Sequence, residues 1–209
     1  MALKMENRTY RLTGITPLLG SQPASRTLRT EFIGNKAPSP AMADEEDEML
    51  GNIDEKGLTV FLRDDNDNSL IMLDYMMRGY LKGALEGLVA QTEIKQPRSK
   101  VDRYVFTGPR RIQILRDGEP IIDEDDQLER PLRAETMRGP RVSLAASEMI
   151  DLPWSVEFVV TLLPNPVSKS SAQVTWDAIE TALDYGQFQG LGQWRNGGYG
   201  RFTWERIDQ

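Results

Sequence analysis

The chain has 209 residues, a length typical of one domain, with 39% apolar and 27% charged residues. It contains no cysteine and no histidine. Their absence excludes disulfide bonds, thiolate metal sites, a cysteine nucleophile and the imidazole that most often serves as general base at neutral pH. The sequence has no P-loop, GxSxG or SxxK motif. We therefore expect a binding protein rather than an enzyme, without cofactor or metal site.

The sequence offers no signal for a membrane or for export. No apolar run approaches the roughly 20 residues that a membrane-spanning helix needs. Residues 1–11 lack the apolar stretch of a secretory signal. These observations predict a cytoplasmic protein with no membrane partner.

The formal net charge of −7 conceals a strong asymmetry along the chain. Residues 44–67 hold ten acids and two bases, and residues 117–129 hold seven acids and no base. These stretches carry −8 and −7, so the remaining chain carries +8. A basic scaffold with two acidic stretches leaves room for a phosphate-binding surface. Each stretch alone is also typical of a plain solvated loop.

Alternating apolar residues predict strands at Thr9–Thr16, Trp154–Leu163 and Tyr199–Ile207. The second of these ends in a continuous apolar run, which favours a central strand. Residues 18–56 lose the pattern and predict a long loop, with a short ordered piece at Arg29–Ile33. The three strands thus lie near the beginning, in the second half and at the end of the chain.

A hairpin and two helices fill the intervals. Apolar runs at 58–63 and 69–73 flank the turn sequence DDNDN. The 3–4 spacing of apolar residues predicts helices at Asp74–Gln91, with Asp74 as N-cap, and at Val174–Tyr185, ended by Gly186. Three glycines lie on one stripe of the first helix: Gly79, Gly83 and Gly87. Such a stripe can let the helix pack closely on a sheet, which we favour, or let another chain or a phosphate approach.

Two basic stretches complete the chain. Val101–Arg116 is strand-like, broken by TGP, and predicts a basic, arm-like hairpin. Arg133–Ala146 predicts further strand with a turn at Gly139–Pro140. Together the elements predict an α+β, ferredoxin-like (RRM-like) βαββαβ palm. It would be a single domain over 1–209, with an acidic insertion at about 34–57 and a basic hairpin plus acidic loop at about 97–140.

The most informative stretch is Gly190–Trp204, with the sequence GLGQWRNGGYGRFTW. Such a loop can adopt positive φ angles and present N–H groups to phosphate, while its arginines supply charge and its rings can stack on bases. Trp154, Phe158 and Trp176 fit a core position better than a stacking platform. Trp194 and Tyr199, on the glycine loop, fit either role.

The segment GLGQWRNGGYGRF resembles the C-terminal glycine-rich loop of the repeat-associated (RAMP) superfamily, the RNA-binding subunits of CRISPR effector complexes. The segment MMRGYLKGALE is similar to that family's first-helix pattern, and ETMRGPRVS approximates a third motif. Within the family the chain looks most like the repeated backbone subunit. The resemblance implies a palm with a thumb-like hairpin that polymerises along a guide RNA.

The resemblance also implies roles for individual residues. Arg78 and Lys82 would face the nucleic-acid backbone, and Arg195 and Arg201 would contact phosphates. The remaining implied contacts are the arm, the close-approach glycines and the stacking rings: Arg103, Arg110, Arg111, Gly197, Gly198, Gly200, Trp194 and Tyr199.

The chain departs from the family pattern in several places. Family members that cleave their target use an acid in the loop after the first strand, but residues 17–30 hold none. Members that process guide RNA commonly use histidine, which is absent. The helix pattern begins LDYMMRGYLKG instead of IPGSSLKG, and the acidic residues 44–55 have no counterpart. These departures fit a diverged relative, for instance one encoded by a phage or another mobile element.

Three hypotheses follow. The first is a non-catalytic binder of single-stranded nucleic acid, RNA rather than DNA, that forms a homo-oligomer along the strand and joins effector-complex subunits. The second is an anti-defence or protein-interaction factor whose acidic loops occupy a partner's basic groove. The third, a metal-dependent nuclease using Asp64, Asp65 and Asp67 or residues 123–126, is least favoured because DDNDN does not fit a calcium loop.

Overall fold

The computed structural model describes residues 4–24, 58–136, 139–164 and 172–208. The acidic insertion at about 34–57 and the ordered piece predicted at Arg29–Ile33 lie outside them. Within the described residues, no helix has the length and apolar character needed to cross a membrane.

The central sheet is built around β1 (Glu6–Gly14), which lies between β13 (Phe202–Arg206) and β12 (Ser155–Leu162). The other side of β12 pairs with β7 (Val105–Gly108) and then β8 (Arg111–Arg116). All these neighbours run antiparallel. The predicted strands at the beginning, second half and end of the chain are therefore confirmed, and the second is central.

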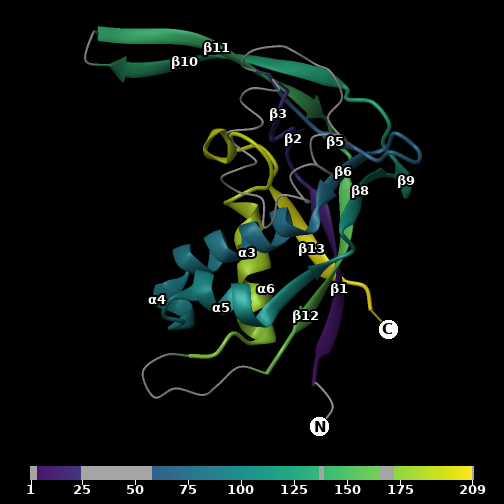
Figure 1. Cartoon of the computed structure of the whole chain (residues 1–209), viewed down its shortest axis with the longest axis vertical. Helices are drawn as coiled ribbons and strands as arrows, with labels where there is room; N and C mark the ends of the chain where they lie inside the picture. Colours follow the sequence, from purple (N-terminus) through teal and green to yellow (C-terminus); the bar gives the residue numbers. More distant parts are fainter. Residues whose placement is uncertain (1–3, 25–57, 137–138, 165–171, 209) are drawn as a thin grey trace.

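The order of these strands defines the fold. If β7 and β8 are counted as one, the strands follow the spatial order fourth, first, third, second. Helix α3 (Asp74–Gly87) precedes the second strand and α6 (Trp176–Asp184) precedes the fourth. Both helices cover the same face of the sheet (Figure 1). This is the βαββαβ arrangement, so the predicted α+β, ferredoxin-like fold is confirmed.

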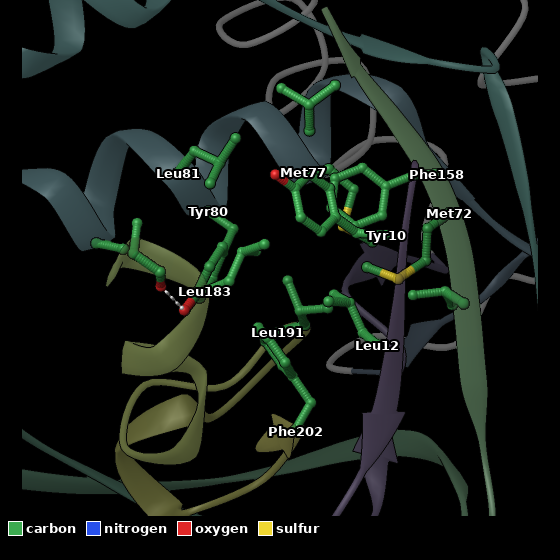
Figure 2. Close-up of a cluster of buried hydrophobic side chains, with 14 of the residues drawn as sticks. Tyr10, Leu12, Met72, Met77, Tyr80, Leu81, Phe158, Leu183, Leu191 and Phe202 are labelled. Carbon is green, nitrogen blue, oxygen red and sulfur yellow. Dashed lines mark hydrogen bonds between the residues drawn. The ribbon is translucent and has the colours of Figure 1, made fainter. Parts of the chain in front are cut away.

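Alternation explains how β1 and β12 cover the core. Tyr10 and Leu12 on β1 are fully buried, as are Val156 and Val160 on β12, because every second side chain points towards the helices. Figure 2 shows these strands and helices meeting around Tyr80, whose hydroxyl donates to the Ala182 carbonyl at 2.7 Å. The rings predicted to be core are confirmed as such for Trp154 and Phe158, whereas Trp176 is half-buried.

Helix α3 follows its apolar spacing but is shorter than predicted. It ends at Gly87, and a separate turn of helix, α4 (Val89–Thr92), follows. The N-cap is Leu73 rather than Asp74. Asp74 is already helical, and its carboxylate accepts a hydrogen bond from the Tyr75 amide at 2.8 Å.

The glycine stripe of α3 does not serve packing on the sheet, which corrects the favoured interpretation. A Cβ added at Gly79 would meet nothing within 4 Å, and one at Gly83 would meet only the Gln189 side chain at 3.9 Å. Only Gly87 approaches another element, the Tyr185 ring, at 3.5 Å. The stripe therefore faces outward, partly towards the segment that follows α6.

Helix α6 forms where predicted. Its N-cap, Thr175, accepts a hydrogen bond from the Ala178 amide at 3.2 Å, which satisfies one of the first free N–H groups. A 3-10 turn, η1 (Tyr185–Gln187), extends the helix past its predicted end at Gly186.

The predicted basic arm at Val101–Arg116 is wrong. The first residues of this segment, 101–104, form the last turn of helix α5 (Pro97–Tyr104). Pro97 is the first residue of that helix, where the backbone N–H has no hydrogen-bond partner within the helix and proline is favourable. The rest forms β7 and β8, which both lie along β12. Val105, Ile112 and Ile114 are fully buried or nearly so, and this apolar face holds the segment on the palm.

The arm of the molecule is a later hairpin. Strands β10 (Asp126–Thr136) and β11 (Gly139–Ile150) pair antiparallel from Asp126 and Met149 outward and extend away from the palm (Figure 1). The strand predicted in Arg133–Ala146 is part of this hairpin, but the turn predicted at Gly139–Pro140 is wrong, because these residues begin β11 and pair with Thr136 and Glu135. Residues 137–138 lie outside the described chain.

A second, smaller sheet anchors the hairpin. Strand β11 pairs with β2 (Leu18–Leu19) and with β4 (Leu58–Val60), which pairs with β3 (Gln22–Pro23). The predicted DDNDN hairpin is confirmed by β5 (Leu62–Arg63) pairing with β6 (Leu70–Leu73). A two-residue strand, β9 (Glu119–Pro120), pairs antiparallel with the end of β8.

Candidate nucleic-acid interface

The glycine-rich loop, residues 190–201, is fixed to the start of the chain by backbone hydrogen bonds. The Gly200 amide donates to the Pro17 carbonyl at 2.7 Å, and the Leu191 amide donates to the Gly200 carbonyl at 2.8 Å. A short 3-10 turn, η2 (Arg195–Gly197), forms its tip. The loop is therefore an ordered scaffold that can hold side chains in place.

The glycines serve packing within the loop. Gly200 has a φ of +68°, and a Cβ there would lie 2.1 Å from the Leu191 carbonyl oxygen. The amides of Gly197 and Gly198 donate to the carbonyls of Trp194 and Arg195 at 2.8 and 2.9 Å. The amides of Gly197, Gly198 and Gly200 are therefore engaged within the protein and do not offer N–H groups to phosphate. The expectation that these glycines let a nucleic-acid backbone approach closely stays a prediction.

The side chains of the loop form a stacked column. The rings of Trp194 and Tyr199 are stacked, with centroids 5.3 Å apart and planes at 19°. The guanidinium carbon of Arg130, on β10, lies 4.5 Å from the Trp194 ring centroid. Trp194 remains 39% exposed and has a φ of +47°, which a bulky residue rarely adopts. The column holds this conformation and joins the hairpin to the loop.

Arg130 is the functional candidate that the sequence analysis missed. Its side chain is 8% exposed, and its Nε and Nη1 atoms are buried without a hydrogen-bond partner. Burial lowers the pKa of its guanidinium. One feature of the sequence could have identified Arg130. It follows the acidic run and, by strand alternation, shares a face with Asp126 and Leu128. A buried arginine on such a face is unusual.

Two predicted arginines of the loop also lack carboxylate partners. Arg195 is exposed on η2. The backbone amide of Arg201 donates to the Thr16 hydroxyl at 2.9 Å, and its side-chain Nε is buried without a hydrogen-bond partner. Among the described residues, no acid forms an ion pair with Arg130, Arg195 or Arg201. We call these three residues the loop arginines.

Three other predicted contacts are instead paired with acids. Arg110 contacts Asp74 at 2.7 Å, and Arg111 contacts Asp64 and Asp65 at 3.2 and 2.9 Å. Lys82 forms an ion pair with Asp102. The structure does not bring Arg110 or Arg111 to the glycine-rich loop, because both lie where β8 meets the DDNDN turn and α3.

Arg78 and Arg103 lie on helices. Arg78 is half-buried on α3 beside the outward-facing Gly79, and Arg103 is exposed on α5. Neither forms an ion pair with a described residue. A further aromatic ring, that of Phe188, precedes the loop in sequence and is 70% exposed. Its centroid lies 6.3 Å from that of Tyr185. No sequence motif had identified this residue.

Four acids in the described parts of the acidic stretches are paired with arginines, Asp64 and Asp65 among them. Arg63 contacts Glu124 at 2.8 Å, and Arg116 contacts Asp125 at 2.5 Å. We call the region around these pairs and Arg111 the paired rim. Within the described ranges, no three acidic side chains come together in a way that could hold a metal ion.

No protein-family model matches the sequence, and no curated protein matches it. A solved structure, that of the type III-B Cmr-beta bound to cognate target RNA, contains a chain that is similar with a TM-score of 0.44 and 10% sequence identity. The similarity covers 97% of the present chain and 60% of that chain. The present chain thus spans less than two thirds of that protein's length.

Proposed function

We propose that the protein is a non-catalytic binder of single-stranded nucleic acid, RNA rather than DNA, that assembles side by side along the strand like a CRISPR effector backbone subunit. The observation that carries the proposal is the group of loop arginines, which have no carboxylate partner among the described residues, together with the Trp194–Tyr199 stack. The motif resemblance in the glycine-rich loop and in α3 supports the assignment to RNA.

The chemistry of the cluster suits a single strand. Unpaired guanidinium groups attract phosphates and release their counterions, and a ring that is partly exposed can stack on any base. Trp194 and Phe188 are such rings, 39% and 70% exposed. A duplex would hide its bases from them, so an unpaired strand uses more of this surface.

Assembly along the strand is tested by size-exclusion chromatography with light scattering, before and after treatment with RNase or DNase. We expect a large species with a high absorbance ratio at 260 to 280 nm that RNase reduces to small protein particles. A clean small species that ignores added single strands would contradict the proposal. It would favour the partner-mimicking factor instead.

Variants connect this result to the loop. Replacing Arg195 and Arg201 with Ala should abolish the co-purifying nucleic acid. The matched control is Arg111→Ala together with Arg116→Ala, which removes the same charge from the paired rim. The proposal requires the control to retain nucleic acid.

A further inference from the structure

The guanidinium of Arg130 is buried without a counter-charge among the described residues. A buried guanidinium loses the hydration of its charge and regains stability only through hydrogen bonds and a counter-charge. Here the Nε and Nη1 atoms have no hydrogen-bond partner, and the Trp194 face at 4.5 Å is the contact that the structure provides. A cation–π contact stabilises the cation by less than the burial of an unpaired ion costs.

No described carboxylate is placed to neutralise this charge. Glu129, the neighbour in sequence, is exposed and belongs to the opposite face of β10. The cross-strand partner is Ala145, which carries no charge. The acids Glu124 and Asp125 at the start of the hairpin are paired with Arg63 and Arg116.

We propose that Arg130 is the seat of a phosphate group, at the point where the root of the β10–β11 hairpin meets the Trp194–Tyr199 stack. The inference rests on the proposed function and assigns one backbone phosphate of the bound strand to this position. A guanidinium fork matches the geometry of phosphate oxygens and binds them with two parallel hydrogen bonds. Because Arg130 belongs to the hairpin and Trp194 to the loop, the phosphate also holds these two parts together.

The first arm of the test uses inorganic phosphate on the whole chain. Thermal unfolding is followed at rising phosphate, with chloride keeping the ionic strength constant. The wild-type Tm should rise with phosphate. Arg130→Met should have an equal or higher Tm without phosphate, because it removes an unpaired buried charge, and should lose the phosphate response. Arg130→Lys should keep part of that response.

The control is Arg206→Met, which removes the same charge from an exposed pair with Asp208. It should retain the full phosphate response. If Arg130→Met instead lowers the Tm while the phosphate response persists, Arg130 is a structural cation–π partner and the inference is overturned.

The second arm uses single-stranded oligouridine with a normal or a neutral methylphosphonate backbone. Arg130→Met should weaken binding of the normal strand about tenfold, the scale of one charge-assisted contact. It should reduce the salt slope by about 0.7 and leave binding of the neutral strand unchanged. If the wild type binds the strand and Arg130→Met binds it equally well, the inference fails and the proposed function stands. If no strand binds but phosphate still acts through Arg130, the seat serves a free anion and the proposed function fails.

Discussion

Two arginine-rich regions of this protein differ in what faces their charges. On the paired rim, Arg63, Arg111 and Arg116 contact carboxylates of the DDNDN turn and of the acidic run before the hairpin. At the glycine-rich loop, the Arg130 guanidinium lies over the Trp194 ring, and Arg195 is exposed. The arginines of the first region are paired with acids, whereas those of the second have no acidic partner among the described residues.

The difference shows that charge counted along the chain is a poor guide to available charge. The sequence separates acidic stretches from a scaffold with a formal +8, but the fold sets part of that positive charge against the acids. Exposed pairs of this kind contribute little to stability. Their main effect here is to remove arginines from the set that can attract phosphate.

The largest effect is expected from breaking the second region. Arg195→Ala combined with Arg201→Ala should weaken binding of single-stranded oligouridine about a hundredfold, since each charge-assisted contact is worth about tenfold or more. The salt slope should fall by about 1.4 for the two lost phosphate contacts. Fluorescence anisotropy across a salt series measures both. Equal losses in the control with Arg111→Ala and Arg116→Ala would erase the distinction between the regions.

The stacked ring should come next. Trp194→Ala should weaken binding of the same strand about tenfold, because stacking of one base on an aromatic ring is worth about 1–3 kcal/mol. Trp194→Phe keeps a ring and should retain most of the affinity. An alanine variant that binds normally would show that the column only positions Arg130.

The paired rim should respond in the opposite way. Arg116→Ala removes hydrogen bonds to Asp125 and to the carbonyls of Asp151 and Pro153. It should lower the free energy of unfolding by about 1 kcal/mol and leave strand binding unchanged. Urea denaturation and anisotropy on the same samples test this, and a binding loss without a stability loss would contradict it.

The smallest effect concerns Glu148, a 5% exposed acid beside the rim whose Oε2 accepts the Phe61 amide at 2.7 Å. Burial raises its pKa, so the folded state holds the proton more strongly than the unfolded chain. Its contribution therefore becomes unfavourable as the pH rises above the ordinary value of 4.5. Glu148→Gln should be at least as stable as the wild type at pH 7.

The pH dependence provides the check on Glu148. The advantage of Glu148→Gln should disappear as the pH falls below the ordinary glutamate pKa, where both forms are neutral. Urea midpoints measured across pH 4 to 7 would reveal it. A glutamine variant that is less stable at pH 7 would show that the weak 3.7 Å contact with Arg63 outweighs burial.

The strands and helices of the palm could be predicted because residues close together in sequence determine where each of them begins and ends. The alternation in β12 and the Thr175 cap of α6 are visible in a few consecutive letters. The arm was assigned to the wrong segment because strand pattern does not say which strand a segment pairs with. Val105 and Ile114 pair β7 and β8 with β12, whereas β10 and β11 pair mainly with each other.

The candidate site was predicted only for residues that are neighbours in the sequence. The loop residues from Trp194 to Arg201 are adjacent in sequence, and their glycine pattern identified them. Arg130 is more than sixty positions away and reaches Trp194 only through the fold. The pairing of Arg111 with Asp64 is likewise a contact between distant segments, so composition counted both as independent charges.

The most direct test of the contrast is zero-length ultraviolet cross-linking of the wild-type protein to single-stranded oligouridine, followed by peptide mass spectrometry. We expect the cross-linked peptides to lie in residues 188–201, with Trp194 or Tyr199 carrying the uridine. Cross-links confined to residues 63–67 and 111–116, or none at a concentration where the strand is bound, would contradict the assignment of nucleic-acid binding to the glycine-rich loop.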